Sequence, residues 1–487
     1  MTQAEALDIL KTGVNVFLTG EPGSGKTHTI NEYVKYLRER NVAVAITAST
    51  GIAATHLGGM TIHSWSGIGI KNKLDGYELN KIAGNEYIFK RIKRARVLVI
   101  DEISMLSAET LSMVEAVCRE VKQNMLAFGG LQVILVGDFF QLPPIYPVRN
   151  RLDEKLLEQS RLYSTRRRNL FKISNGVSET QAELFEENFG HFAYDSSAWA
   201  RAKPLVCYLT EQYRQDDDNF LAVLAAIRGN YFDEEHFEHL EARKISFKKT
   251  PPNALKLFSH NADVDKLNNE MLSKIKSEPE IFEMTTQGPA GLVEILVKGC
   301  LSPEILELKI GAEVMCTKNN KQMGFVNGTI GQVTGFASDS NYPIIRTRHG
   351  QTMEIEPMEW TVEENGRIRA RLTQIPLRLA WAITVHKSQG MSLDEAVMDL
   401  SHVFEYGQGY VALSRVRRLA GLYLLGWNER AFLVHPEILE KDVAFRTESN
   451  NAELAILGLA SGEKEKLHHN FILSCGGNLK IGLKKLK

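Results

Sequence analysis

The chain is poor in the features that mark exported, metal-bound or membrane proteins. It has five cysteines among 487 residues and no Cys-x-x-Cys pair, which argues against a structural zinc site and a disulfide framework. No stretch reaches the roughly 18 apolar residues that a membrane-spanning helix needs. The first ten residues include Glu5 and Asp8 and lack the basic start and long apolar core of a secretory signal. We therefore expect a protein of the cytoplasm with no membrane partner.

The chain also lacks an excess of either charge and any fixed-period repeat. Its 58 lysines and arginines and 59 aspartates and glutamates give a formal net charge of −1. Such a chain is not a polycation, so any binding to nucleic acid must depend on a local groove. The hydrophobic fraction of 44% and the charged fraction of 24% are ordinary for a globular protein, and the length suggests about three domains.

A glycine-rich loop near the start is the most informative stretch. Residues 20–27 read Gly-Glu-Pro-Gly-Ser-Gly-Lys-Thr, after an apolar run at Val14–Leu18 and before a helical pattern at Thr29–Arg40. Strand, glycine loop and helix are the context of a phosphate-binding P-loop, in which backbone N–H groups and the helix start hold phosphates. Lys26 is expected to reach the β- and γ-phosphates of a nucleoside triphosphate, and the Thr27 hydroxyl to bind Mg²⁺.

Two carboxylates follow a later apolar run. Val97–Ile100 predicts a strand buried on both faces of a parallel sheet, and Asp101 and Glu102 follow it at the edge where such sheets bind ligands. Asp101 is expected to hold Mg²⁺, and Glu102 to orient or deprotonate the attacking water. Together with the P-loop, the pair completes the pattern of a site that hydrolyses a triphosphate.

Four other residues are candidates for the same site. Gln141 follows a third buried strand, Leu131–Val136, where its amide can sense the γ-phosphate. Arg415 lies toward the end of a predicted helix, and its planar, permanently charged group suits charge developing on that phosphate. Arg214 is a second candidate, although such an arginine is more often part of a surface ion pair. Gln3, just ahead of the P-loop, either folds back onto the edge of adenine or is a surface glutamine.

Further stretches have the composition of a nucleic-acid surface. Thr50 lies in a hydroxyl-rich strand end that suits contact with a phosphate backbone. His63 and Trp65 lie in a glycine-flanked loop, where an exposed Trp65 would stack on a base, although the residues alone favour its packing beneath the loop. Residues 87–96 are basic and are interpreted as a solvated helix face. Residues 255–261 again predict a strand that ends in hydroxyl and amide groups, which indicates a second α/β lobe.

The remaining segments of the chain differ in their residue patterns. Residues 295–371 contain short, β-branched, glycine-punctuated runs that predict a small β-barrel or sheet inserted in the second lobe. Residues 379–390 predict a helix that runs into a polar loop. Residues 146–190 hold a basic and then an acidic cluster and predict a partly helical surface insertion within reach of DNA. The tail beyond 450 ends in lysines, and we expect it to be poorly ordered.

Seven motifs now stand in order along the chain. They are the P-loop at 20–27, Ala-Ser-Thr-Gly-Ile-Ala-Ala at 48–54, Ile-Asp-Glu-Ile-Ser-Met-Leu at 100–106, Gly-Asp-Phe-Phe-Gln-Leu-Pro-Pro at 137–144, Glu-Gln-Tyr-Arg-Gln at 211–215, Val-His-Lys-Ser-Gln-Gly at 385–390 and Ala-Leu-Ser-Arg at 412–415. Together they resemble the motif set of the superfamily 1B helicases. The chain looks most like the petite-integration-frequency family, relatives of RecD, because residues 111–131, ending Phe-Gly-Gly-Leu, are similar to its signature. The resemblance covers roughly residues 1–145 and 190–435.

The resemblance implies an α/β fold with two RecA-like P-loop lobes, ATP and Mg²⁺ between them, and single-stranded DNA across their tops. The first lobe would span 1–200, with a small wedge insertion at 64–84 and an atypical insertion at 146–190. The second lobe would span 201–294 and 376–435, with an SH3-like β-barrel insertion at 295–375 and an extension of unknown role at 436–487. The resemblance also implies translocation 5′ to 3′ and action at DNA junctions. We further expect a monomer in solution and a cytoplasmic, nucleoid-associated protein.

The resemblance assigns roles residue by residue on these motifs. Catalysis is expected to involve Lys26, Asp101, Glu102, Gln141, Arg214 and Arg415. The nucleotide is expected to contact Gln3, Gly23, Ser24, Gly25, Lys26, Thr27, His28 and Gly390, and Mg²⁺ to bind Thr27 and Asp101. The DNA path is expected to be lined by Thr50, Thr61, His63, Trp65, Pro144, His260, Asn261, His386, Lys387 and Ser388.

Three other functions share parts of this pattern. An ATP-dependent switch that binds a protein would have the P-loop and the acidic strand, but no use for the motifs at 385–390 and 412–415. A P-loop kinase would be smaller, would carry a lid and would show no DNA-stimulated turnover. Among helicases, a RecD-like enzyme of recombination or transposition is the nearer alternative.

Overall fold

The structure is a computed structural model that describes residues 1–69, 71, 73–144, 192–251, 254–320, 322–325, 327–347, 350–364 and 367–479. The predicted insertion at 146–190 lies outside the described residues. None of the helices in the described ranges has the length and apolar character needed to cross a membrane.

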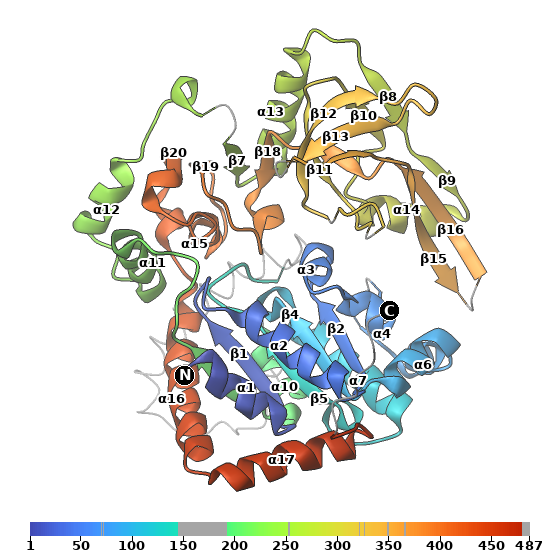
Figure 1. Ribbon diagram of the computed structural model, residues 1–487, viewed down its shortest axis with the longest axis vertical. Helices are drawn as coiled ribbons and strands as arrows, with labels where there is room; N and C mark the ends of the chain where they lie inside the picture. Colours follow the sequence, from blue (N-terminus) through green and yellow to red (C-terminus); the bar gives the residue numbers. More distant parts are fainter. Residues whose placement is uncertain are drawn as a thin grey trace, which may run out of the picture.

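The first lobe is built on a six-stranded parallel sheet (Figure 1). Its strands are β1 (Val16–Gly20), β2 (Val44–Ala48), β3 (Met60–Thr61), β4 (Val97–Asp101), β5 (Gln132–Val136) and β6 (Leu205–Leu209), in the order β3-β2-β4-β5-β1-β6. The expected boundary between the lobes at residues 200 and 201 is wrong, because β6 pairs with β1 in the first sheet. Side chains of β1 alternate between two cores: Val16 and Leu18 pack on one face of the sheet and Phe17 on the other. A strand covered on both faces needs a continuous apolar run, which these strands have.

Helices cover both faces of this sheet. They are α1 (Gln3–Lys11), α2 (Lys26–Glu39), α3 (Gly51–His56), α4 (Ile62–Ser66), α5 (Gly76–Ala83), α6 (Glu86–Arg94), α7 (Ala108–Lys122) and α10 (Ser197–Ala202). α1 begins with a capping box, in which Thr2 Oγ1 accepts from the Glu5 backbone N–H and Glu5 accepts from the Thr2 backbone. Such caps place the start of α1, and with it Gln3, beside the P-loop.

The second lobe has a four-stranded parallel sheet, β18-β7-β19-β20. Its strands are β7 (Leu255–Phe258), β18 (Ala382–Thr384), β19 (Ala396–Leu400) and β20 (Leu422–Trp427), and its helices are α11 (Asp218–Gly229), α12 (Glu234–Glu241), α13 (Asn261–Ser273) and α15 (Gln408–Leu413). The helix predicted at residues 379–390 is wrong, because Ala382–Thr384 pair with β7 as a strand. A sheet neighbour distant in sequence decided the conformation, which no local pattern reveals.

Antiparallel strands form a separate module between β7 and β18. They are β8 (Glu280–Glu283), β9 (Thr285–Gln287), β10 (Ile305–Leu308), β11 (Glu313–Cys316), β12 (Ile330–Phe336), β13 (Pro343–Thr347), β14 (Thr352–Glu354), β15 (Met358–Glu364), β16 (Arg367–Gln374) and β17 (Leu377–Leu379), with helix α14 (Ala290–Gly299). The module starts at Glu280, earlier than the expected 295, because β8 pairs with β10 and β9 pairs with β16. Its core includes Val314, Val333 and Ile345.

The C-terminal extension folds onto the first lobe as two helices, α16 (Pro436–Leu457) and α17 (Ser461–Ser474). The Ser449 hydroxyl of α16 accepts from the Tyr208 backbone N–H at 3.0 Å. On α17, Ile472 is fully buried, and the ring of Phe471 lies against Gly13, where an added Cβ would be 2.1 Å from it. The prediction that the tail beyond 450 is poorly ordered is therefore wrong for the residues up to 479.

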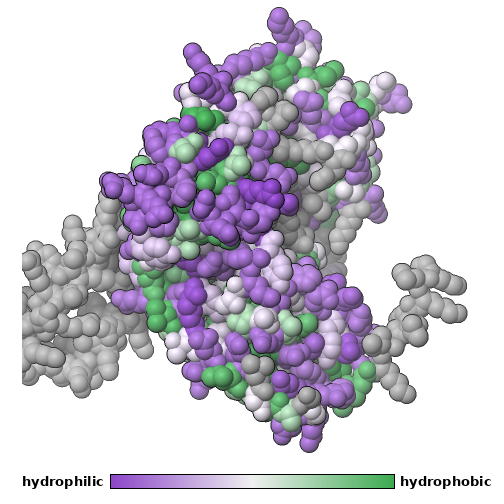
Figure 2. All heavy atoms as spheres, turned by 60° about the vertical axis from the view of Figure 1, so that its left-hand side comes forward, coloured by the Kyte–Doolittle hydropathy of each residue, from purple (hydrophilic) through white to green (hydrophobic). Residues whose placement is uncertain are grey.

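Short 3₁₀ helices complete the description. They are η1 (Ile103–Met105), η2 (Ala127–Gly130), η4 (Ala193–Asp195), η5 (Phe247–Lys249), η6 (Val385–Ser388), η7 (Leu419–Gly421) and η8 (Glu429–Phe432). On the described part of the side that Figure 2 shows, hydrophilic residues dominate and hydrophobic ones form only small groups.

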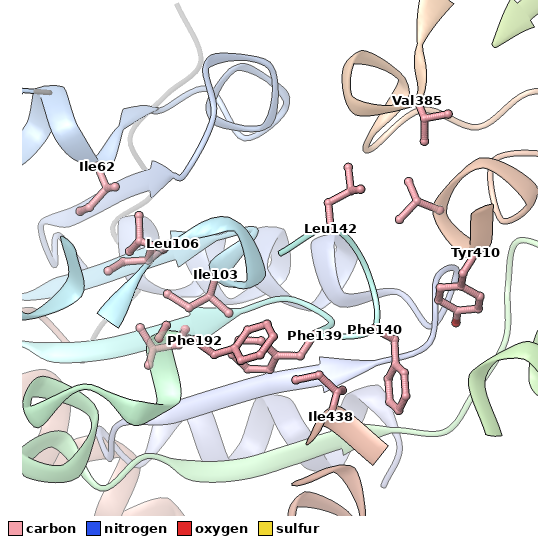
Figure 3. Close-up of a cluster of buried hydrophobic side chains, with 14 of the residues drawn as sticks. Ile62, Ile103, Leu106, Phe139, Phe140, Leu142, Phe192, Val385, Tyr410 and Ile438 are labelled. Carbon is pink, nitrogen blue, oxygen red and sulfur yellow. The ribbon is translucent and has the colours of Figure 1, made fainter. Parts of the chain in front are cut away.

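One hydrophobic cluster continues from the first lobe into the second. Figure 3 shows Phe140 and Leu142, which follow β5, together with Val385 and Tyr410 of the second lobe. Gly407 of the second lobe has φ of 75°, and a Cβ there would lie 2.4 Å from the Phe140 carbonyl oxygen. The segment 137–144 is therefore packed against both lobes, beside the cleft between them.

Candidate active site

The P-loop has the backbone conformation that holds phosphates. Gly23 and Gly25 have φ of 94° and 85°, in the left-handed region that favours glycine. A Cβ at Gly25 would lie 1.9 Å from Nε2 of Gln3, which donates to the Ser24 carbonyl at 3.1 Å. Gln3 therefore lies directly over the loop, as the adenine-reading interpretation of this residue requires.

A cavity of about 870 Å³ opens between the lobes beside this loop. Residues that line it include Gly23, Gly25, Lys26, Thr27, Asp101, Glu102 and Gln141 of the first lobe, and Arg214, Gly390, Ser392, Asp394, Arg415, Arg417 and Arg418 from later in the chain. The fold thus brings every residue predicted to be catalytic to one cavity, from segments far apart in the sequence.

Three cations of this cavity, Lys26, Arg214 and Arg415, form no ion pair with any described residue. Lys26 Nζ donates only to the backbone carbonyls of Gly20 and Glu21, at 2.7 and 3.0 Å. Arg415, 2% exposed, donates through Nε to the Val411 carbonyl at 2.9 Å. Burial lowers the pKa of Lys26 to about 8 and that of Arg415 to about 9. Uncompensated cations in a shared cavity fit a polyphosphate, whose charge would offset the cost of burying them.

Asp101 and Glu102 face these cations at the end of β4. Burial, and then the neighbouring charge of Glu102, raise the pKa of Asp101 to about 7, and burial raises the pKa of Glu102. Glu102 has φ of 52°, an uncommon conformation for a residue with a side chain. With the Thr27 hydroxyl, the Asp101 carboxylate supplies the oxygen ligands that Mg²⁺ prefers, so these residues fit the ion.

Asp101→Asn is expected to raise the thermal unfolding midpoint of the nucleotide-free protein at pH 8 while abolishing ATP hydrolysis. The folded pKa of Asp101 lies above its unfolded value of 3.8, so ionisation of this carboxyl opposes folding. That cost is complete above pH 7, shrinks as the pH falls through 7 and is absent below about 4. Calorimetry of both proteins should show midpoints that converge at low pH. A constant difference between the midpoints would contradict the prediction.

A buried ion pair lies behind Gln141. Arg228 Nη1 donates to both carboxylate oxygens of Asp138, at 2.9 and 3.0 Å, and Gln141 Nε2 donates to the same carboxylate at 3.4 Å. Arg228 also donates to the hydroxyls of Tyr208 and Tyr410, at 2.7 and 3.1 Å. Burial opposes the charge of Arg228, but the Asp138 carboxylate keeps its pKa above the ordinary value. Helix α11 is therefore tied to the segment that carries Gln141.

Arg228→Met is expected to lower the thermal unfolding midpoint by more than about 5 °C. Removing one partner of a buried pair leaves the other charge buried, which costs about 3–5 kcal/mol. The double variant Asp138→Leu/Arg228→Met should recover part of the loss, because no charge then stays unpaired. Arg446→Met is the control: this side chain donates to Tyr208 but is 45% exposed, so its effect should be small. Equal losses at Arg228 and Arg446 would contradict the account.

A second cavity, of about 370 Å³, also joins the two lobes. It is lined by Thr50, Ala53 and Met105 of the first lobe and by Ser259, His260, Asn261, Thr384, His386, Lys387, Gln389, Phe404 and Glu405. The ring of His260 stacks on Phe404 with centroids 4.7 Å apart, and burial lowers the pKa of Lys387 to about 8. Hydroxyls, amides, a lysine and stacked rings together suit a nucleic-acid strand, whose phosphates and bases they can contact.

Comparison with known proteins identifies the family. The model of the PIF1-like helicase family matches residues 3–193, and the model of the DNA helicase Pif1 2B domain matches residues 292–336. The ATP-dependent DNA helicase Pif1 of Psychrobacter sp. (strain PRwf-1) is 39% identical, over 98% of this chain and 76% of its own length. The chain belongs to the PIF1-like helicase family.

Solved structures of PIF1-like proteins share its mixed α/β, RecA-like fold. The crystal structure of the Pif1 helicase from Candida albicans has a TM-score of 0.76 at 30% identity, covering 91% of this chain and 98% of that chain. The Pif1 helicase from Bacteroides, in complex with ADP-AlF3 and single-stranded DNA, has a TM-score of 0.70 at 27% identity, covering 92% and 97%.

In this PIF1-like protein, Gln389 stands in the wall between the two cavities. It lines the smaller cavity, and its Nε2 donates at 3.0 Å to Oε2 of Glu102, which lines the larger one. Its neighbour Gly390 also lines the larger cavity. Gln389 belongs to the motif at 385–390, but that motif gives no sign of a contact with Glu102. The ion pair between Asp138 and Arg228 was also not predicted from the sequence. Asp138 lies in the motif at 137–144, but Arg228 lies in none of the motifs.

Three predicted nucleotide contacts, Gln3, Ser24 and His28, do not line the larger cavity. Gln3 lies over the P-loop through its hydrogen bond to the Ser24 carbonyl, Ser24 is 1% exposed, and His28 is exposed on α2. The expected contact of His28 with the nucleotide is therefore not supported by its position.

Several predicted DNA contacts also lie outside the smaller cavity. Trp65 is 4% exposed and packs in the hydrophobic core, so the prediction that its ring stacks on a base is wrong. Ser388 is fully buried, and its hydroxyl donates to the Val385 carbonyl at 2.7 Å, so its side chain does not face DNA. Thr61 caps α4 by accepting from the Ser64 backbone. Burial lowers the pKa of His63, and Pro144 is buried. Thr50, His260, Asn261, His386 and Lys387 do line the cavity.

Proposed function

We propose that the protein is an ATP-dependent DNA helicase that moves 5′ to 3′ along single-stranded DNA and unwinds the duplex ahead of it. The observation that carries this proposal is the shared wall of the two cavities, where Gln389 of the proposed DNA site is hydrogen-bonded to Glu102 of the proposed ATP site. A nucleotide-only enzyme or a protein-binding switch has no need of this connection.

The proposed ATP site has residues on both sides of the cleft. Lys26 binds the β- and γ-phosphates from the first lobe, and Arg214 and Arg415 bind the γ-phosphate from the opposite side. Glu102 orients the attacking water and accepts its proton. Thr27 and Asp101 are the ligands for Mg²⁺, whose chemistry there is to neutralise charge on the phosphates. Because the cations belong to both lobes, the triphosphate draws the lobes together and hydrolysis releases them.

DNA is moved by the same closure. Thr50 belongs to one lobe and His260, Asn261, His386 and Lys387 to the other, so closing and opening shifts one set of contacts along the strand relative to the other. Gln141, held by Asp138 and Arg228, reports the γ-phosphate to helix α11. Most contacts would be to phosphates and stacked bases, so binding has little sequence preference and weakens with salt.

The two insertions are assigned to the DNA junction. We assign residues 64–84, which include α5, to the wedge, and the antiparallel module from β8 to β17 to an SH3-like barrel. The match of residues 292–336 to the Pif1 2B-domain model supports the second assignment. Both cavities are complete within one chain, so we also propose that the free protein acts as a monomer.

The test is unwinding of two duplexes that differ only in carrying a 5′ or a 3′ single-stranded tail. With ATP and Mg²⁺, strand separation is expected from the 5′ tail alone. Separation from the 3′ tail alone would overturn the proposed direction, and failure on both tails despite ATP hydrolysis would overturn the helicase proposal.

A further inference from the structure

A third cavity lies at the outer edge of the first lobe. It has a volume of about 1050 Å³ and is bounded by residues 42–46 at the start of β2, Gly58–Met60, helix α6 and Cys475. Five cations line it: Arg38, Lys90, Arg91, Arg94 and Arg96. We call it the basic groove. Figure 1 shows α4 and α6 toward the edge of the first sheet that carries β2.

The basic groove is made by the polar face of α6. Tyr87, Arg91 and Arg94 are spaced i, i+4 and i+7 and so share one helix face, while Ile92 is fully buried in the core. Tyr87 is 56% exposed. From the sequence alone we expect this face to be solvated, but in the fold it lines a cavity together with Arg96 and with Arg38 of α2. The amphipathic pattern of α6 explains why its face with Ile92 is buried. It does not explain why Arg38 and Arg96, from other segments, gather beside its polar face.

Within the described part of the chain, the charges of the groove are not balanced by a carboxylate in its lining. Among these residues, no aspartate or glutamate lines the basic groove or an adjoining cavity of about 350 Å³, which shares Arg96 and is lined by Lys93 and Lys122. Arg38, Arg94 and Arg96 form no ion pair with any described residue, and Lys90 pairs only with Glu86 on the exposed side of α6. Gathered like charges oppose folding and do not stabilise it, so they indicate an anionic ligand.

The groove also meets an open sheet edge and the proposed DNA site. Strand β3 pairs with β2 only at Thr47 and Ala48, so within the described chain Val44–Ile46 have no strand partner on that side. Unpaired backbone N–H groups add donors for phosphate oxygens. Met60 lines the groove, and the next residue, Thr61, is one that the family resemblance assigns to the DNA path. Strand β2 lines the groove with Val44–Ile46 and is followed by Thr50, which lines the smaller cavity, so the two sites lie toward opposite ends of one strand.

We propose that the basic groove binds the phosphodiester backbone of a second nucleic-acid segment at the fork, separate from the strand held between the lobes. The proposal rests on the proposed helicase function for the existence of a fork. The exposed ring of Tyr87 can stack on a base, while the arginines contact phosphates, so the groove reads no sequence. The backbone can belong to the duplex arm or to the displaced strand.

The test uses the full chain without nucleotide, so that it does not depend on hydrolysis. Arg94→Ala/Arg96→Ala removes two exposed cations, and Lys248→Ala/Lys249→Ala removes two exposed lysines far along the chain as the matched control. Fork affinity of the groove variant should fall about tenfold or more at 0.1 M salt, and the slope of log K against log [salt] should drop by about 1.4–1.8. Affinity for single-stranded DNA, the DNA-stimulated ATPase rate and the thermal midpoint should match the control.

Two substrates identify the source of the backbone. If the groove variant loses affinity only for a fork with both arms, the displaced strand occupies the groove; if it also loses affinity for a 5′-tailed duplex, the duplex arm does. Both outcomes support the proposal. Unchanged fork affinity and an unchanged salt slope would overturn the proposal. It would also be overturned if the groove variant lost binding to a polyglutamate peptide but kept its fork affinity, because the groove would then bind a protein partner at the β2 edge. If neither tailed duplex were unwound but the groove variant still lost fork affinity, the helicase proposal would be overturned and the groove proposal would stand.

Discussion

Arg415→Ala is expected to reduce the kcat of DNA-stimulated ATP hydrolysis by about 10³-fold or more, the range measured for arginine fingers. The Arg415 side chain is buried, has no carboxylate partner among the described residues and lines the same cavity as Lys26. Its charge is therefore available to the transferring phosphoryl group, where negative charge develops. Because this contact strengthens in the transition state, the KM for ATP should change much less than kcat. Steady-state ATPase assays with saturating single-stranded DNA measure both constants.

Two further variants separate the role of Arg415 from a general charge effect. Arg417→Ala removes a cation from the rim of the same cavity, but this side chain is 56% exposed and pairs with Asp394 at 3.5 Å, so the rate should stay within about tenfold of the parent. Arg415→Lys keeps a charge but loses the planar fork, and should rescue little activity. Equal losses at positions 415 and 417 would show that the site needs net charge rather than a finger.

Lys26→Ala is expected to reduce kcat/KM for ATP by about 10³-fold while leaving the affinity for single-stranded DNA unchanged in the absence of nucleotide. Lys26 is the P-loop cation, and its ammonium donates to the Gly20 and Glu21 carbonyls. The DNA cavity lies elsewhere and does not include it. Nucleotide-binding and DNA-binding titrations on the same preparation measure the two effects.

His28→Ala is the matched control for Lys26. His28 is two residues further along α2, is exposed and lines neither cavity, so its removal should leave hydrolysis at the parent rate. Hydrolysis at the parent rate in Lys26→Ala would refute the assignment of the P-loop site. A large loss in His28→Ala would instead restore the predicted contact between His28 and the nucleotide.

Local patterns predicted the parts of the site that local physics determines. The P-loop needs glycines at fixed places, and the carboxylates need a buried strand before them, so both can be recognised within a few residues. That the P-loop and the two carboxylates line one cavity was predicted only through the resemblance to the helicase family, and the comparisons confirm that family. Trp65 shows the limit of a loop pattern: the residues alone favoured burial, and the fold buries it.

Contacts between distant segments could not be predicted from the sequence. Arg228 and Asp138 are 90 residues apart, and nothing near Arg228 marks it as buried. Ala382–Thr384 became a strand because β7 lies beside them. Helices α16 and α17 pack on the first lobe through residues such as Phe445, Ser449 and Ile472, in a stretch without a strong apolar stripe. In each case the partner is set by the tertiary fold.

The central claim is that ATP hydrolysis in one cavity depends on DNA in the other. The most direct measurement is the steady-state rate of ATP hydrolysis with and without a single-stranded oligonucleotide, at a DNA concentration shown by titration to saturate binding. The account predicts a large rise in kcat with DNA, because Gln389 of the proposed DNA site is hydrogen-bonded to Glu102, which is proposed to orient the attacking water. The same rate with and without bound DNA would contradict the account.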